Sequence, residues 1–432
     1  MSSTDASPPY DAPPRCKVLV LNESDEGGGA ARAALRISMG LRRRGVDLEM
    51  AVQRMLGERY WVVRAGSTKQ KLLTRTLQRI DALPNMLYPD RRDAPWSNNW
   101  FPYDAGRAYG FDRYDLLHFH WVAGGLVPVR AFANIKQPVV WTLHDMWGFT
   151  GGCRYTEDCT RYEEACGCCP LLGSRKAQDL SARNLRAKRR AFAGKNMHIV
   201  SPSNWLAAAA RQSALFRDFE VSVIPNGIDL EVYRPIGRKA ARNFFGFPEE
   251  ARIILFGTSN AIHDERKGFP LLRLALGELA KEGNTNGMQL VVFGSNEPRE
   301  PLDVGVPIRF MGQLSDDVSL AGLYAAADVM VVPSRQENLA NTIMEAMACG
   351  TPVVAFGIGG NGDLVDNRVS GYLAKPFEPV DLAAGIAWVL GDAARLAELS
   401  AAARAKCERT FSLDVVCGQY ENLYRRMVTV GG

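Results

Sequence analysis

Short apolar runs, separated by polar turns and helix-length stretches, recur along almost the whole chain. In the first half such runs occupy residues 17–21, 116–120, 139–143, 198–201 and 221–224. In the second half they occupy residues 253–257, 290–294, 308–312, 329–332 and 353–356. Short apolar runs that alternate with amphipathic helices are typical of parallel sheets covered by helices. The pattern therefore predicts an α/β fold with one parallel sheet in each half of the chain.

The clearest break in this alternation is the turn PNGID at residues 225–229, which follows the last strand of the first half. A chain of 432 residues is too long for one typical core, so two domains are expected. We assign residues 16–224 to an N-terminal domain and residues 225–411 to a C-terminal domain. Residues 412–432 are expected to form a closing helix, and the Pro/Ser/Ala-rich residues 1–15 a disordered leader.

The most informative stretch is VVPSRQENLANTIMEAMACGTPVVAF, residues 331–356. A strand stops at Pro333, a polar loop holds Glu337, a short helix carries Glu345, and a second strand follows. Ligands of open α/β sheets bind at such strand ends, where helix N-termini converge. The two carboxylates could therefore approach one ligand from two sides. The alternative is a solvated loop beside a surface carboxylate.

This whole stretch closely resembles the nucleotide-sugar site of the family 4 retaining glycosyltransferases, and PNGID resembles the crossing between their two domains. The resemblance spans roughly residues 16–427. It implies the GT-B architecture, two facing Rossmann-like domains with a cleft between them and a last helix that crosses back. It also implies that Glu337 meets the donor sugar and Glu345 the ribose. The diphosphate would meet the amides between them, at Asn338, Leu339, Ala340 and Asn341.

A glycine loop and a basic turn are the next candidates for phosphate contacts. Gly27 to Gly29 separate a strand from a helix, which lets amides approach a phosphate, although such a turn can also be only a tight connection. The resemblance places Gly28 and Gly29 beside the donor phosphates. Lys267 precedes a helix and matches the family's Lys-Gly, where it would neutralise a departing diphosphate rather than be an exposed basic residue.

The family normally carries an arginine a few residues before this lysine, and residues 258–263 contain none. Two alternatives remain at this point. Either Arg266 takes part, or one cation and several amides hold the diphosphate.

Three of the five histidines lie at or near strand ends in the first half. A single histidine is more often structural than catalytic, but a position beyond a strand end favours a role in the cleft. His144 matches the family histidine that lies beside the transferred sugar. His120 is a candidate for the acceptor side, and His118 is interpreted as structural.

The segment Gly148 to Pro170 contains five of the nine cysteines. Cys153, Cys159, Cys166 and Cys169 could hold a structural zinc ion, which would order this loop. The alternatives are reduced packing thiols, or disulfides in an oxidised sample. A subset of polysaccharide-forming family members has a similar HDMW-x-x-TGGC loop with trailing cysteines, which favours a structural role.

Composition limits the expected cellular location of the protein and the kinds of partner that it could bind. The net charge of +5 gives no argument for nucleic acid, and no apolar run is long enough to span a membrane. Nine cysteines without a signal-peptide core indicate a reducing compartment, so we expect a cytoplasmic protein. Basic and apolar residues alternate over 69–80. This segment is either a solvated helix or a contact with anionic lipid, which would place the protein on the inner face of the membrane.

The function that the resemblance implies is retaining transfer of a hexose from a UDP- or GDP-sugar to a glycan or lipid-linked acceptor, without a catalytic cofactor. Colanic-acid-type exopolysaccharide or O-antigen synthesis is the expected setting. An epimerase or phosphorylase on the same fold, and a non-catalytic zinc-ordered binding protein, are the alternatives. A glycosidase pair fits poorly, because Glu345 lies on a helix behind a phosphate-type loop.

Overall fold

The computed structural model describes residues 16–64, 80–100, 104–257, 261–314 and 316–429. The leader 1–15 and almost all of the basic segment 69–80 lie outside these residues, and so does 258–260. Within the described ranges, no helix has both the length and the apolar composition needed to cross a bilayer.

The first half forms a seven-stranded parallel sheet in the order β3-β2-β1-β4-β5-β6-β7. The strands are β1 Lys17–Ser24, β2 Asp47–Arg54, β3 Val62–Arg64, β4 Leu116–Phe119, β5 Val139–Thr142, β6 Met197–Ser201 and β7 Glu220–Val223. The helices of this half are α1 Gly29–Arg43, α3 Ala105–Tyr109, α4 Leu180–Phe192 and α5 Asn204–Gln212. Alternate strand residues enter two separate apolar clusters, one on each face of the sheet.

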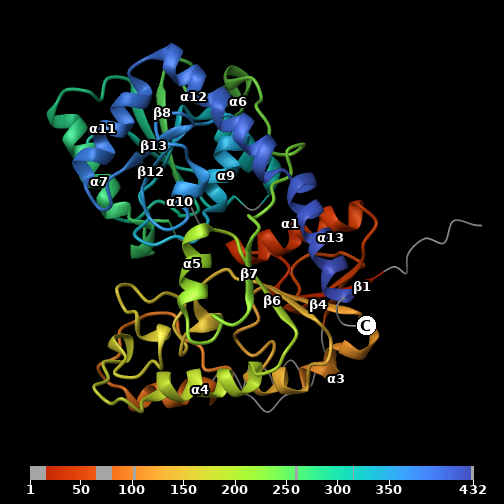
Figure 1. Ribbon diagram of the computed structural model, residues 1–432. Helices are drawn as coiled ribbons and strands as arrows, with labels where there is room; N and C mark the ends of the chain where they lie inside the picture. Colours follow the sequence, from red (N-terminus) through yellow and green to blue (C-terminus); the bar gives the residue numbers. More distant parts are fainter. Residues whose placement is uncertain (1–15, 65–79, 101–103, 258–260, 315, 430–432) are drawn as a thin grey trace, which may run out of the picture.

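The second half forms a six-stranded sheet in the order β10-β9-β8-β11-β12-β13. Its strands are β8 Arg252–Gly257, β9 Met288–Phe293, β10 Ile308–Phe310, β11 Val329–Val332, β12 Val353–Phe356 and β13 Gly371–Ala374. Its helices are α6 Arg238–Phe245, α7 Phe269–Lys281, α8 Asp317–Ala326, α9 Asn341–Ala348, α10 Asn361–Leu364, α11 Pro379–Leu390 and α12 Ala393–Lys406. Figure 1 shows the two sheets in two lobes, with α1 and α5 of the first lobe next to the second.

The helix α13, Leu413–Thr429, packs on the first lobe and lies beside α1 (Figure 1). Its apolar side chains share one cluster with β1 and α1. Gly40 permits the close approach of the two helices, because a Cβ at that position would collide with Cys417 Sγ. Two tyrosines then reach the sheet: Tyr420 OH lies 2.8 Å from Thr142 Oγ1, and Tyr424 OH lies 2.6 Å from His118 Nδ1.

Two helix-covered parallel sheets joined at residues 224–251 are the GT-B arrangement, so the predicted fold class is confirmed. The strands β2 and β3 were not among the predicted elements. Parallel strands place their carboxyl ends at one edge of each sheet, and in this fold the two edges face one another. The polar residues that follow β1, β4, β5 and β11 are therefore brought together.

Candidate active site

Lys267 and Glu337 form a close ion pair at the end of β11. Lys267 Nζ lies 2.7 Å from Glu337 Oε2, and Ser334 Oγ lies 3.4 Å from the same oxygen. Gly268 makes this approach possible: its φ is +73°, and a Cβ there would collide with the Pro333 carbonyl oxygen. The Lys267 and Glu337 side chains are 21% and 13% exposed, so both retain access to the cleft.

A cavity beneath this pair is small. It lies at the ends of β8 and β11 and is lined by Lys267, Ser334, Glu337 and Thr342, and its volume is about 10 Å³. That is room for about one water molecule and far less than a sugar needs. A sugar bound at this pair must therefore lie outside this cavity, on the exposed side of the pair.

The residues after Glu337 join the two domains. Asn338 Oδ1 accepts a hydrogen bond from Ser203 Oγ at 2.7 Å, and Asn338 Nδ2 donates to the His144 carbonyl oxygen at 3.3 Å. Leu339 and Ala340 are buried, and α9 begins directly after them. The Asn338 side chain is thus an interdomain contact, while the amides at the start of α9 keep the place that the sequence predicts for the diphosphate.

The glycine loop of the first domain meets the start of α9. Asn341 Nδ2 donates to the Gly29 carbonyl oxygen at 3.0 Å, and Asn226 Nδ2 donates to Asn341 Oδ1 at 3.1 Å. No described atom lies within 4 Å of a Cβ built at Gly28. The N-terminal ends of α1 and α9 therefore face the same space, and both present positive dipole ends to it.

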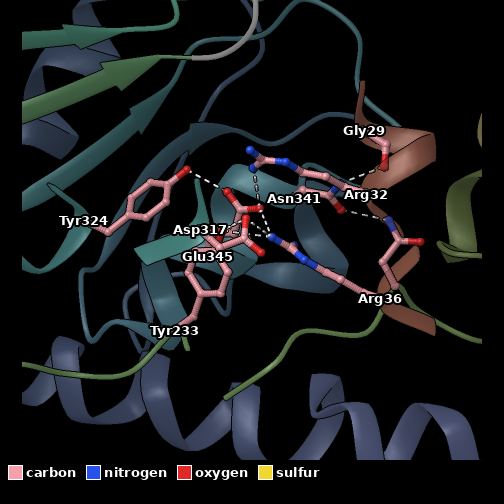
Figure 2. A network of polar contacts seen from close by, with 9 residues as sticks. Gly29, Arg32, Arg36, Tyr233, Asp317, Tyr324, Asn341 and Glu345 are labelled. Atoms are coloured by element: carbon pink, nitrogen blue, oxygen red, sulfur yellow. Dashed lines mark hydrogen bonds and ion pairs between the residues drawn. The ribbon is translucent and has the colours of Figure 1, made fainter. Parts of the chain in front are cut away.

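Glu345 is the most enclosed of the predicted residues. Its side chain is 0% exposed, and Figure 2 shows Arg32 and Arg36 reaching it from α1. Arg36 Nη2 lies 2.8 Å and Arg32 Nη1 3.2 Å from Oε1, and Tyr324 OH donates to Oε2 at 2.9 Å. Burial and the Glu345 charge raise the pKa of Tyr324, which keeps its hydroxyl a donor.

Sequence reasoning missed both arginines, although their i,i+4 spacing behind the glycine loop was visible. Arg36 also contacts two other residues of the second domain. Its Nη2 donates to Tyr233 OH at 2.9 Å, and Tyr233 OH in turn donates to Asp317 Oδ1 at 2.8 Å (Figure 2). Burial opposes the charge of Arg36, but Glu345, Tyr233 and Asp317 together hold its pKa above the usual value.

The histidines form a buried group across β4 and β5. His120 Nδ1 lies 2.9 Å from His144 Nε2, whereas His120 Nε2 is buried without a partner among the described residues. A buried N–H without an acceptor is costly, so we place the His120 proton on Nδ1 and the His144 proton on its own Nδ1. Burial lowers the pKa of His144 to about 4, so its ring is neutral at pH 7.

His120, the candidate for the acceptor side, directly follows the end of β4. It is 2% exposed and contacts His144 through Nδ1, so it is itself almost closed to solvent. Its neighbour His118 is fully buried and bonded to Thr142, as the structural interpretation predicted.

Arg266 is engaged by its own turn. Its Nη2 lies 2.7 Å from Asp264 Oδ2, its Nε lies 3.2 Å from Oδ1, and its guanidinium lies over the Tyr155 ring. Asp264 thus offsets the Arg266 charge, in contrast to Lys267, whose only described ion-pair partner is Glu337.

The zinc prediction is not supported. Within the described residues, no three His, Cys, Asp or Glu side chains are placed to hold one metal ion, and none of the nine cysteines forms a disulfide. Burial raises the pKa of Cys166 to about 12, so the metal-free thiol is protonated at pH 7. The loop is held in another way: Lys188, buried below it, donates to the Trp147 and Thr150 carbonyl oxygens.

Comparison with known proteins agrees with this geometry. A family model described as "Glycosyl transferases group 1" matches residues 251–392. A second model, described as "Glycosyltransferase Family 4", matches residues 27–232. The matched models and the fold are those of a glycosyltransferase. More specifically, the chain belongs to the family 4 glycosyltransferases.

Among curated relatives, the D-inositol 3-phosphate glycosyltransferase of Xylanimonas cellulosilytica is 27% identical over 92% of both chains. The protein with the same name from Geodermatophilus obscurus is 38% identical over 42% of each chain.

Two solved structures share the whole fold. The sucrose-phosphate synthase of Thermosynechococcus elongatus has a TM-score of 0.67 and 20% identity, covering 96% of this chain and 100% of its own. Anabaena HepE in complex with UDP and glucose has a TM-score of 0.65 and 19% identity, covering 95% of this chain and 100% of its own.

Proposed function

We propose that this glycosyltransferase moves a hexose from a nucleoside diphosphate sugar to a hydroxyl group with retained anomeric configuration. The observation that carries the proposal is the Lys267–Glu337 pair. Glu337 directly precedes Asn338, which contacts the His144 carbonyl oxygen. Asn341 joins the start of α9 to the start of α1. A cation and two helix N-termini suit a diphosphate, and a carboxylate suits sugar hydroxyls. The structures of Anabaena HepE with UDP and glucose, and with UDP-glucose, add support for a UDP-sugar donor.

The main chemical requirement at this site is to stabilise the charges that develop during transfer. When the bond between the sugar and the diphosphate breaks, its electrons leave with the diphosphate and the sugar becomes oxocarbenium-like. Lys267 would stabilise the departing anion, Glu337 would orient the sugar, and Glu345 would hold the ribose hydroxyls. A neutral His144 can hydrogen-bond a sugar hydroxyl without adding a positive charge beside a cationic sugar. No metal ion is needed for these roles.

Ligand binding followed by product analysis tests the proposal. A thermal-shift screen of UDP-, GDP- and ADP-sugars should find one class that raises the melting temperature, and transfer should then require an acceptor. Conversion of the donor without an acceptor would indicate an epimerase, and dependence on phosphate would indicate a phosphorylase. If no sugar nucleotide binds or turns over, the proposal is wrong and a non-catalytic role takes its place.

We further propose a lipid-linked acceptor at a membrane surface, as in polysaccharide biosynthesis. Three exposed apolar side chains lie in one short 3-10 helix, η1 Leu83–Leu87: Leu83, Met86 and Leu87 are 54%, 73% and 80% exposed. Arg91 and Arg92 follow closely. Exposed apolar side chains beside basic ones suit an anionic lipid surface.

Co-sedimentation with phosphatidylglycerol vesicles tests the membrane contact. M86E/L87E should reduce binding several-fold, whereas V318E, which changes one isolated exposed valine on α8, should not. Equal binding by all three proteins would refute the membrane contact.

D-inositol 3-phosphate is the soluble acceptor to compare with a lipid-linked one in the transfer assay, because the curated relatives are named for it.

A further inference from the structure

The partners of Glu345 account for most of its hydrogen-bonding capacity. A carboxylate offers roughly four acceptor sites. Arg36, Arg32 and Tyr324 occupy three of them, and the side chain is 0% exposed. The two hydroxyls of a ribose would need two sites. One of the three present partners must therefore leave before Glu345 can hold a ribose as proposed above.

The two arginines differ in how easily they can leave. Arg36 is 6% exposed, and Tyr233 and Asp317 hold it in addition to Glu345. Arg32 is 25% exposed and its bond to Glu345 is longer. Among the described residues, Glu345 is the one ion-pair or hydrogen-bond partner given for the Arg32 side chain. Without Arg32, Glu345 would still be paired with Arg36 and Tyr324. Arg32 is thus the partner that can leave without stranding a buried charge.

The position of Arg32 also suits a diphosphate. It lies one turn after Gly28 and Gly29, and the bond between Asn341 and Gly29 joins the N-terminal ends of α1 and α9 at this point. The Arg32 guanidinium could therefore contact an anion bound between the N-terminal ends of α1 and α9 without moving away from them. Its planar donors suit phosphate oxygens. Arg266, the basic residue that the sequence suggested for this task, is engaged by Asp264 instead.

We propose that Arg32 exchanges Glu345 for the donor diphosphate, and that it thereby supplies the cation that the family normally carries upstream of Lys267. This inference rests on the proposed function. Donor binding would then release Glu345 for the ribose and recruit Arg32 from the other domain in one event. Arg36 stays on Glu345 throughout and fixes its orientation.

Binding of UDP and of uridine, measured by titration on the wild-type chain and on variants, tests this exchange. R32A should raise the UDP dissociation constant by about tenfold to a hundredfold, the range for a lost charge-assisted hydrogen bond. The uridine dissociation constant should fall rather than rise, because R32A removes the partner that the ribose must displace from Glu345 and uridine has no phosphate to receive Arg32. R32K, which keeps a charge but not the planar fork, should lie between wild type and R32A.

The matched control is R43A. Arg43 lies on the same helix and forms an ion pair of 2.8 Å with Asp229, away from Glu345. R43A should alter neither the UDP nor the uridine dissociation constant.

Three results would overturn the role of Arg32: an unchanged UDP constant in R32A, tighter UDP binding, or equal weakening of UDP and uridine. Tighter binding would mean that Arg32 only blocks the site. If the wild-type chain binds no UDP, GDP or ADP, the donor proposal itself fails. Failure of the Arg32 proposal alone would give a different result: the wild-type chain would bind UDP, and R32A would bind it equally well.

Discussion

Glu337 and Glu345 lie eight positions apart in the sequence and have opposite surroundings. Glu337 is 13% exposed and is paired with Lys267 of its own domain. Glu345 is 0% exposed and is paired with two arginines of the other domain. The first carboxylate keeps its partner wherever the first domain lies. The second has its partners only while the two domains are in contact.

This difference divides the donor site into two parts. The part that would hold the sugar is built inside the second domain, and the part that would hold the ribose is completed by contact between domains. Substitutions near Glu337 should therefore act on chemistry, and substitutions near Glu345 should act first on stability. The predictions below test this division.

Replacement of the cation at Glu337 should have the largest effect on transfer. K267A should lower kcat for the donor found in the screen by about a hundredfold to a thousandfold, the range for loss of one group that stabilises transition-state charge. Its melting temperature should stay close to that of the wild type, because the pair is partly exposed. K281A is the control, since Lys281 is 72% exposed and far along α7. Full turnover by K267A would refute the assignment.

Replacement of the cation behind Glu345 should have the opposite profile. R36M should lower the free energy of unfolding by about 3 kcal/mol, since removal of one partner from a buried ion pair is costly, although Arg32 still offsets part of the charge. Denaturant titration measures this loss. The comparison with K267M is decisive: equal losses in R36M and K267M would contradict the division of the site.

The buried histidines His118 and His144 of the first domain are uncharged at pH 7, and the pH dependence of stability tests this. Burial and the neighbouring His144 lower the pKa of His118 to about 3, whereas an unfolded histidine has a pKa near 6.5. Between these values the unfolded chain binds more protons, so stability falls as pH falls below about 6.5. The slope for one histidine is at most about 1.4 kcal/mol per pH unit. H118Q should reduce the slope between pH 7 and pH 5, and the exposed-residue variant H263Q should leave it unchanged.

The smallest effect is expected at Arg266. Because Asp264 already binds its guanidinium, R266A should change kcat by less than about fivefold, the range of a partly exposed ion pair. A loss as large as that of K267A would instead assign the second cation to Arg266 and would argue against Arg32.

Local sequence patterns predicted more of the fold than of the candidate site. Apolar runs, the glycine stops and the turn at 225–229 were enough to indicate two parallel sheets. The strand β2 was missed because its continuous apolar run, residues 50–52, is only three residues long and lies between polar residues. Sequence motifs singled out Glu337, Glu345 and Lys267 as candidates. The loop after β11 and helix α9 carry the two glutamates in one short stretch, and the turn before α7 carries the lysine.

The partners of Glu345 could not be predicted in the same way. Arg32 and Arg36 resemble ordinary surface arginines of an amphipathic helix, and long charged residues are rarely buried. Only the contact between α1 and α9, which is distant in sequence, makes them part of the site. The burial of His120 is likewise a consequence of the sheet, which brings its ring into contact with His144.

The helix α13 makes the order of synthesis matter. It completes the apolar cluster that β1 and α1 begin, and its tyrosines bond to Thr142 and His118. On the ribosome, the first lobe therefore stays unfinished until the whole second lobe has emerged. Nascent chains stopped before α13 should expose the face of α1 around Gly40 and need a chaperone, even though every strand of the first sheet has already been made.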